Sequence, residues 1–179
     1  MIATKPTDII DLLEVFNIGL VHKIIDISQV TLCADTVIAN EEEPDYFFIE
    51  LSLCSNINDV LTLINGYIKQ DKHLIASRVI LGLLYEQLTS KVIQLDNAVS
   101  ILYWLTWNCE LTEAEKDYLY AIEDRYDLVC QGIIGCIGSV KEYATGFLFV
   151  YKDLNLSNSE NWNRISSSID DALKNLHLG

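Results

Sequence analysis

The sequence predicts an all-α protein of about eight or nine helices, on three observations. Apolar residues recur at three- and four-residue spacing along most of the 179-residue chain. Half of the residues are hydrophobic and only 2 are proline, so the chain can bury a core and has few helix breakers. Capping-box pairs precede three of the apolar runs, namely Thr112 with Glu115, Ser139 with Glu142, and Ser157 with Glu160. Because no linker follows Pro44, we expect a single domain over residues 1–179, built as a helix bundle or a short α-solenoid.

The N-terminal part is predicted to form two helices before a proline-containing turn. Thr7 can cap the first helix, and Gly19 is a typical C-terminal stop. Apolar residues at helical spacing predict a second helix over residues 20–38. Pro44 suits the first position of a further helix. The apolar run within residues 45–54 fits a strand as well as a helix, and the pattern leaves both open.

The middle of the chain is predicted to hold two more helices. Asn56 or Asn58 can cap the first of them. The dipeptide Asn65-Gly66 within this segment is typical of a β-hairpin turn. The apolar spacing around it fits a helical period better, so a helix is preferred. Residues 72–89 are apolar nearly all round, which indicates a central, buried helix.

Capping residues predict the helices of the C-terminal half. The expected N-caps are, in order, Asp96, Thr112, Ser139 and finally Ser157 or Ser159. The apolar stripe that follows Thr112 continues to Ile133. Glycines then recur every third residue in an apolar run, which favours close packing of helices there. These glycines are Gly132, Gly135 and Gly138.

The charge of the chain limits its partners. It carries 12 Lys and Arg against 26 Asp and Glu, a formal net charge of -14. This sign argues against binding to nucleic acid or to an anionic membrane, since both attract a positive face, and it favours a basic protein partner. No run approaches the roughly 20 apolar residues that span a bilayer, and the N-terminus lacks the pattern of a secretory signal. We therefore expect a cytoplasmic protein.

Motifs for catalysis or cofactor binding are absent from the sequence. Phosphate-binding glycine loops and the hydrolase elbow do not occur, and nothing singles out one pair among the many carboxylates. The three histidines lie far apart in sequence, so no metal site is predicted. The neighbouring Trp104 and Trp107 suit core packing, with Trp107 near the surface, better than a nucleic-acid stacking platform. The chain is predicted not to be an enzyme and to need no cofactor.

The cysteines indicate a reducing compartment. Their number is odd and none forms a C-x-x-C pair. We expect free thiols that act as small core hydrophobes. They are Cys33, Cys54, Cys109, Cys130 and Cys136.

Most of the net negative charge lies in two stretches. Between Lys23 and Lys69 the chain has eight acidic residues and no basic one, and residues 110–127 hold seven acids against two bases. A solvated face is the ordinary reading of one such run. Two of them, with tyrosines interleaved, favour a one-signed surface for a basic protein. The candidate contacts are Glu41, Glu42, Glu43, Asp45 and Tyr46 in the first stretch, and Glu113, Asp117, Tyr118, Glu123, Asp124 and Asp127 in the second.

A short segment carries a resemblance to a known family. Residues 32–38 read LCADTVI, Pro44 follows the acidic run, and residues 46–53 read YFFIELSL. This order resembles small helical immunity proteins encoded beside polymorphic toxins of Gram-negative bacteria, including contact-dependent growth inhibition systems. Their pattern places an aromatic-Ala-Asp on one helix, a proline-containing turn, and then an Ile-Glu-Leu-Ser helix. Cys33 stands where that pattern has tryptophan, and the match covers about residues 30–54.

The resemblance implies an inhibitor without catalysis of its own. Such a protein binds and blocks a cognate toxin domain, and many of these toxins are basic nucleases. Within the motif, Asp35 and Glu50 are expected to cap or pair with the neighbouring helix. The alternative is a non-catalytic scaffold or adaptor that holds a protein or peptide in a groove between helices. A neighbouring toxin gene favours the first function, and a large apolar groove favours the second.

Overall fold

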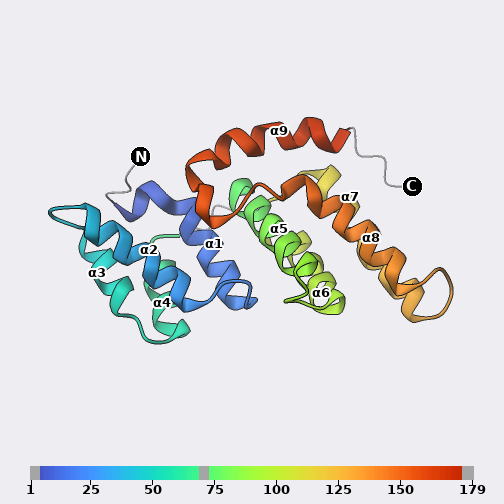
Figure 1. Ribbon diagram of the computed structural model, residues 1–179, viewed down its shortest axis with the longest axis horizontal. Helices are drawn as coiled ribbons and strands as arrows, with labels where there is room; N and C mark the ends of the chain where they lie inside the picture. Colours follow the sequence, from blue (N-terminus) through green and yellow to red (C-terminus); the bar gives the residue numbers. More distant parts are fainter. Residues whose placement is uncertain (1–4, 69–72, 175–179) are drawn as a thin grey trace. The chain divides into compact units, whose positions relative to one another are not determined.

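The computed structural model describes residues 5–68 and 73–174. Within them the chain forms α-helices and short 3-10 helices and no strand, which confirms the all-α prediction (Figure 1). The chain divides into two compact units, Met1–Ala76 and Ser77–Gly179. The single domain over residues 1–179 stays a prediction. No helix among the described residues is both long and apolar enough to cross a bilayer.

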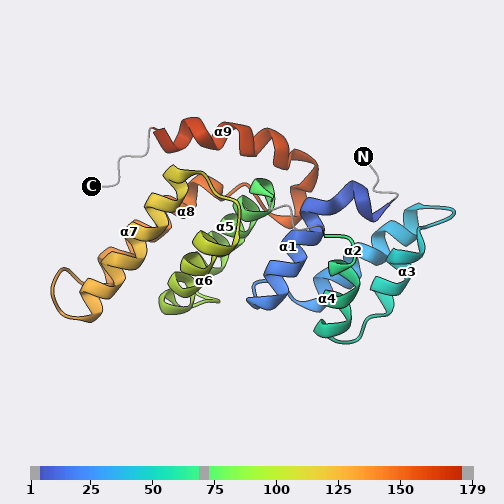
Figure 2. The ribbon, with the colours of Figure 1, turned by 180° about the vertical axis from the view of Figure 1, so that it is seen from behind.

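Unit 1 is built from four helices that follow a short 3-10 helix. Helices α2 and α3 lie side by side, and α1 packs against α4 (Figures 1 and 2). Helix α5 begins at the end of this unit and continues in unit 2. The elements are η1 (Pro6–Ile9), α1 (Ile10–Val21), α2 (Ile27–Asn40), α3 (Tyr46–Leu53), α4 (Ile57–Asn65) and α5 (Leu74–Thr89).

The first two predicted helices have different ends in the structure. Thr7 lies inside η1, and α1 begins only at Ile10. Gly19 does not stop α1. It lies within the helix, where the side chain of Ile25 packs so closely that a Cβ would collide with it. Helix α2 begins at Ile27, because Asp26 and Gln29 form a capping box there.

Residues 45–54, whose sequence fits a strand as well as a helix, contain the helix α3. It starts at Tyr46, so Pro44 precedes the helix and is not its first residue. Asp45 is the N-cap, and its carboxylate accepts a hydrogen bond from the Phe47 backbone N–H at 3.0 Å. Phe47 and Phe48 are buried, with their ring centroids 5.2 Å apart. This one-sided burial explains why a run of strand-like residues is helical here.

Helix α4 confirms the preference for helix over hairpin. Asn56 is its N-cap and accepts a hydrogen bond from the Asp59 N–H at 3.0 Å. The helix ends at Asn65, with Gly66 as its C-cap, so this dipeptide marks a helix end. Gly66 keeps right-handed backbone angles of φ -65° and ψ -22°, so it does not form the left-handed turn that a hairpin needs.

In unit 2, α5 is followed by the helices α6 to α9 and by two short 3-10 helices. Residues 76–84 of α5 are buried, as predicted for a central helix. Helix α7 packs on α6 and on α8 (Figure 2). The elements are α6 (Leu95–Asn108), α7 (Glu113–Cys130), α8 (Ile137–Leu148), η2 (Phe149–Tyr151), η3 (Leu156–Asn161) and α9 (Trp162–Lys174).

Only one of the N-caps predicted for this unit is correct. Thr112 and Glu115 form the capping box at the start of α7, with the Thr112 N–H 2.8 Å from Glu115 Oε2. The other caps are Gln94 for α6, Cys136 for α8 and Asn155 for η3. Asp96 and Ser139 therefore lie in the first turns of their helices, and Ser157 and Ser159 lie inside η3. The predictions are wrong because Ser and Asp are found in the first turn of a helix as well as at its N-cap. Residue type alone therefore does not distinguish the two positions.

The glycine-rich run forms an exposed loop between α7 and α8. Helix α7 ends at Cys130, not at Ile133. Gly132 and Gly135 have φ angles of 72° and 54°, which favour glycine and turn the chain out of the helix. The prediction that helices pack closely at these glycines is therefore wrong, because the run is solvent-exposed. Its exposed isoleucines are Ile133 (60%), Ile134 (45%) and Ile137 (47%).

The five cysteines are all free, as predicted. Cys109 is buried and behaves as a core residue, whereas Cys33 and Cys54 are half-buried. Cys130 and Cys136 are exposed at the two ends of the α7–α8 loop, so the expectation of a core role is wrong for them. Their exposure follows from that of the loop.

A buried ion pair joins the helices of unit 2. The side chain of Arg78 on α5 is only 1% exposed, and its Nε donates to Glu115 Oε1 at 2.7 Å. Its Nη1 donates to the carbonyl and hydroxyl oxygens of Ser166 on α9, and its Nη2 donates to Asp170. The Tyr151 hydroxyl donates to Glu115 Oε1 at 3.0 Å. We call these five residues the Arg78 network.

The Arg78 network leaves neither buried ion without partners. The other carboxylate oxygen of Glu115 accepts hydrogen bonds from the N–H and the hydroxyl of Thr112, both at 2.8 Å. Burial raises the pKa of Tyr151, and the charge of Glu115 raises it further, so the phenol stays a donor. A buried charge pair of this kind is costly to break from one side.

Glu115→Ala should therefore destabilise the protein by about 3–5 kcal/mol, because it leaves the Arg78 guanidinium buried without its carboxylate. Glu113→Ala is the matched control, since Glu113 is 87% exposed and pairs only with Lys116 at the surface. That substitution should cost about 1 kcal/mol or less. Urea unfolding followed by circular dichroism measures both. Equal costs for the two variants would contradict the structural role of the network.

The Cys136 thiol should be more acidic than the Cys54 thiol. As N-cap of α8 it accepts hydrogen bonds from the backbone N–H groups of Ser139 and Gly138, which lower its pKa. Burial and two nearby carboxylates raise the pKa of Cys54 instead. The rate of alkylation by iodoacetamide should rise at a lower pH for Cys136 than for Cys54, because the thiolate is the nucleophile. Peptide mass spectrometry over a pH series measures this, and coincident profiles would refute it.

Candidate functional site

Three aromatic side chains form an exposed cluster on α6 and α7. Tyr103, Trp107 and Tyr120 are 44%, 59% and 36% exposed. The ring centroids of Tyr103 and Trp107 are 6.3 Å apart, and those of Trp107 and Tyr120 are 5.8 Å apart, both edge to face. Trp104 is half-buried beside them. The expectation that Trp107 lies near the surface at a helix end is confirmed. Large exposed aromatic groups of this kind are typical of protein-binding surfaces.

A row of acidic residues runs along the same exposed face of α7. Spacing of three or four residues places its members one above the other on a helix. Tyr120 stands in the middle of this row, so carboxylates lie on both sides of the aromatic cluster. We call the four carboxylates together with Tyr120 the α7 stripe. Its members are Glu113, Asp117, Tyr120, Asp124 and Asp127, all of them exposed.

Lys116 is the basic residue beside the α7 stripe. Its Nζ lies 2.8 Å from Glu113 Oε1, and this hydrogen bond raises the pKa of Lys116. The charge of Glu110 also lies close enough to raise that pKa. The lysine is thus surrounded by acidic groups, and the local surface stays negative. Such a surface attracts cationic side chains of a partner.

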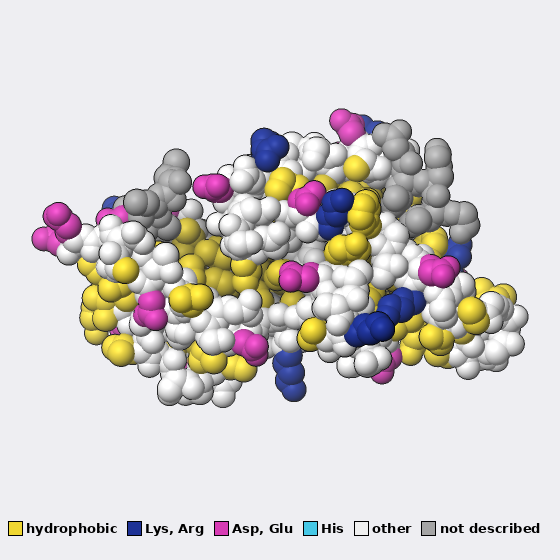
Figure 3. Space-filling model, viewed as in Figure 1, with side chains coloured by type: hydrophobic (Ala, Val, Ile, Leu, Met, Phe, Trp, Pro, Cys, Tyr) yellow, Lys and Arg dark blue, Asp and Glu magenta, His cyan; other side chains and the backbone are white. Residues whose placement is uncertain are grey.

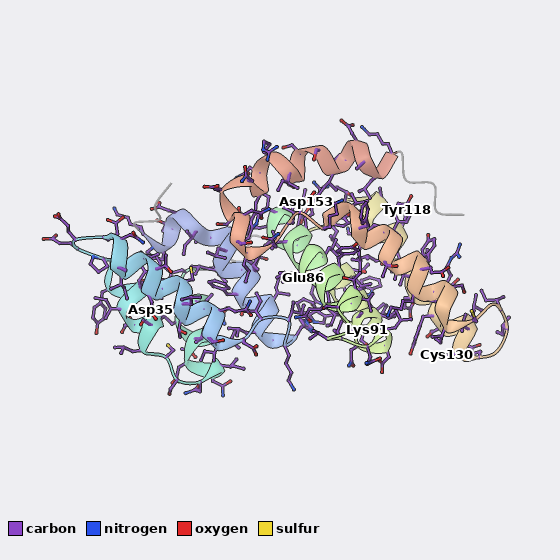
Figure 4. All side chains as sticks on the ribbon, in the orientation of Figure 1. Asp35, Glu86, Lys91, Tyr118, Cys130 and Asp153 are labelled. Atoms are coloured by element: carbon purple, nitrogen blue, oxygen red, sulfur yellow. The ribbon has the colours of Figure 1, made fainter. Side chains whose placement is uncertain are left out.

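The other candidates of the second stretch lie beside this face or inside the unit. Tyr118 is half-buried between α7 and α8, where its ring stacks on Phe147 with centroids 5.1 Å apart (Figure 4). Glu123 is half-buried, and burial followed by the charges of Asp127 and Asp124 raises its pKa. Glu115, which contributes to the charge of this stretch, is fully buried in the Arg78 network. Tyr120, not Tyr118, is therefore the tyrosine that α7 presents to solvent.

The candidate contacts of the first acidic stretch lie at the α2–α3 turn of unit 1. Glu42 and Glu43 are exposed in the turn, and Tyr46 is 68% exposed at the start of α3. Glu41 is the half-buried C-cap of α2, and the carboxylate of Asp45 is the N-cap of α3. Figure 3 shows carboxylates projecting at this turn. The two stretches belong to different units, so their union in one surface stays a prediction.

The segment that carries the family resemblance is a helix pair. Asp35 on α2 accepts a hydrogen bond from the Ser52 hydroxyl on α3 (Figure 4). The expectation that Asp35 pairs with the neighbouring helix is confirmed. Glu50 is exposed, and Cys54 Sγ bonds to its backbone carbonyl at 3.3 Å. The Asp35–Ser52 bond thus fixes α3 against α2.

A hollow of about 460 Å³ lies on the C-terminal part of unit 2. Five of its six lining residues have polar or charged side chains, and none of the six is a candidate predicted from sequence. The lining residues are Asp153, Asn158, Asn161, Arg164, Ile165 and Ser168. Among the described residues, no group of three His, Cys, Asp or Glu side chains is placed to hold a metal ion.

Comparison of the chain with protein-family models, with curated proteins and with solved structures gives no match. The assignment of function therefore depends on the aromatic cluster, the α7 stripe and the acidic turn between α2 and α3.

Trp107→Ala should cost little stability, about 1 kcal/mol, since the side chain is 59% exposed and its edge contacts to Tyr103 and Tyr120 lie at the surface. Phe147→Ala is the contrasting variant, because Phe147 is fully buried. It should cost about 3–5 kcal/mol. Urea unfolding gives both values. If the Trp107 variant were as destabilised as the Phe147 variant, the aromatic cluster would belong to the core and not to a binding surface.

Proposed function

We propose that this chain is an immunity protein that binds and neutralises a cognate toxin domain, a basic nuclease acting on RNA or DNA. The observation that carries the proposal is the α7 stripe, where exposed carboxylates flank the exposed rings of Trp107 and Tyr120. The protein acts by binding and performs no chemistry of its own. Its site of action is the cytoplasm, where a toxin that enters the cell meets its substrate.

Charge supports a basic partner. The net charge of -14 steers cationic proteins toward the chain over long distances. At short range, the α7 stripe offers fixed carboxylates to Lys and Arg side chains. A nuclease needs a positive surface to hold the phosphate backbone of its substrate. A row of carboxylates binds to such a surface and excludes nucleic acid from it.

The aromatic cluster supports durable binding. Exposed charges at the rim of an interface mainly set the rate of association. Tryptophan and tyrosine near its centre are the side chains that most often supply binding energy, because they bury a large rigid surface. Trp107, held between Tyr103 and Tyr120, is the anchor in this proposal.

The first acidic stretch is proposed as an additional contact through its exposed members Glu42, Glu43 and Tyr46. The adaptor alternative requires an apolar groove between helices. The hollow on η3 and α9 is not a groove of large apolar side chains, since Ile165 is the one apolar residue among the six that line it. This lining favours the inhibitor over the adaptor.

The test uses the toxin domain encoded by the neighbouring gene. Asp117→Lys with Asp124→Lys should slow association about tenfold at low salt, because the reversed charges oppose steering. The effect should shrink at high salt, where the screening length is shorter. Glu86→Lys with Glu142→Lys is the matched control, since it makes the same change of charge at exposed sites of α5 and α8. Stopped-flow measurements at two salt concentrations give the rates.

Two results would count against the proposal. Equal slowing at both salt concentrations would exclude steering by the α7 stripe. Failure of the unmodified chain to bind this domain or to protect cells against it would overturn the immunity function itself.

A further inference from the structure

Helix α3 has an apolar face that points away from the core of unit 1. Tyr46 and Leu53 are 68% and 78% exposed, and Ile49 between them is half-buried. Their spacing of three and four residues places them on one face. The opposite face carries Phe47, Phe48 and Leu51, which are all buried. We call Tyr46, Ile49, Glu50 and Leu53 the outer face of α3.

This arrangement is unusual for a surface helix. A helix at the surface of a unit is ordinarily apolar on one side and polar on the other. Helix α3 is apolar on both sides, with Glu50 as the charged member of its outer face. Figure 3 shows hydrophobic side chains gathered over the part of unit 1 that contains α3. An exposed apolar face on a helix typically marks a surface that another molecule covers.

The outer face of α3 is held firmly in place. Asp45 caps the helix, and the Ser52 hydroxyl bonds to Asp35 on α2. The Phe47 ring lies 4.7 Å from the Tyr67 ring, centroid to centroid. A partner that binds here does not have to order the helix first, so less of its binding energy is lost to entropy.

Charge around α3 selects the kind of partner. From residue 24 to residue 68 the chain has eight acidic residues and no basic one. Glu42 and Glu43 are exposed in the turn before α3, and Glu50 is exposed on its outer face. A second copy of this chain would bring carboxylates against carboxylates, and an anionic membrane would be repelled likewise. An apolar segment with basic residues along its edges complements both properties.

We infer that the outer face of α3 is a docking surface for an amphipathic helix of a protein partner, with Leu-like side chains on one face and Lys or Arg at its borders. Tyr46 and Leu53 contact the apolar side chains of that helix, and Glu50, Glu42 and Glu43 pair with its basic residues. This surface belongs to unit 1, whereas the α7 stripe belongs to unit 2. The inference shares Glu42, Glu43 and Tyr46 with the additional toxin contact proposed above, but it rests on the exposed face of α3 and not on the α7 stripe, and its test uses no toxin.

The experiment uses the full chain, labelled with ¹⁵N, and a synthetic peptide of about 18 residues with leucine on one helical face and lysine on the other. The control peptide has the same composition in an order that gives no apolar face. The amphipathic peptide should bind about tenfold more tightly than the control or better, since only it can bury the outer face. Amide shifts should concentrate at residues 42–53.

Variants locate the contact. Tyr46→Ser with Leu53→Ser should weaken binding of the amphipathic peptide about tenfold. Ile133→Ser with Ile134→Ser is the matched control, because it removes two exposed apolar side chains from unit 2 and should leave binding unchanged. Glu50→Lys tests the charge separately and should also weaken binding, whereas Glu86→Lys on α5 should not. Circular dichroism establishes that each variant is folded.

Several outcomes would overturn the inference. Equal affinity for the two peptides would mean that charge alone attracts them. Shifts confined to the α7 stripe or to the loop between α7 and α8 would place the apolar contact elsewhere. Sedimentation of the free chain as a dimer that Tyr46→Ser with Leu53→Ser dissociates would assign the outer face to a second copy. Binding to lipid vesicles in preference to the peptide would assign it to a membrane.

Discussion

The buried guanidinium of Arg78 requires a carboxylate partner, and this requirement determines which helices of unit 2 pack together. A charge with 1% exposure is tolerated only when its hydrogen bonds are satisfied. Glu115, Ser166 and Asp170 supply those bonds from α7 and α9, so three helices meet at one side chain. The same contact sets the rotation of α7 about its axis. With Glu115 turned inward, the α7 stripe faces solvent, and the candidate binding surface follows from the buried ion pair.

Sequence periodicity predicts the helices of this chain well, because their apolar faces obey the helical period. The positions of caps are less accessible from sequence. Ser139 resembles an N-cap in composition, yet Cys136 occupies that place, because a thiol can accept the same backbone hydrogen bond. The short α3 was ambiguous, since eight residues with apolar side chains on both faces show no clear period. Its helical form depends on the Asp45 cap, which is local, and on packing against α2, which is a tertiary contact.

The candidate surface was predictable in its charge and only partly in its residues. Four carboxylates of the α7 stripe were among the predicted contacts. The choice of Tyr120 over Tyr118 requires knowing which side of α7 meets α8. The pairing of Trp107 with Tyr120 joins two helices and has no local signal in the sequence. The helical spacing from Glu113 to Asp124 through Tyr120 was the one clue that favoured Tyr120.

The Arg78 network also has a consequence for how the protein is made. Arg78 meets Glu115 across 37 residues of sequence, but it meets Ser166 and Asp170 across 88 and 92. On a ribosome, α5 emerges long before α9 has been synthesised, and until then water must solvate the guanidinium that the folded unit encloses. Contacts between such distant residues form late and slowly. Unit 2 therefore completes its core only after residue 170 has left the ribosome, whereas the helix pair of α2 and α3 can close much earlier.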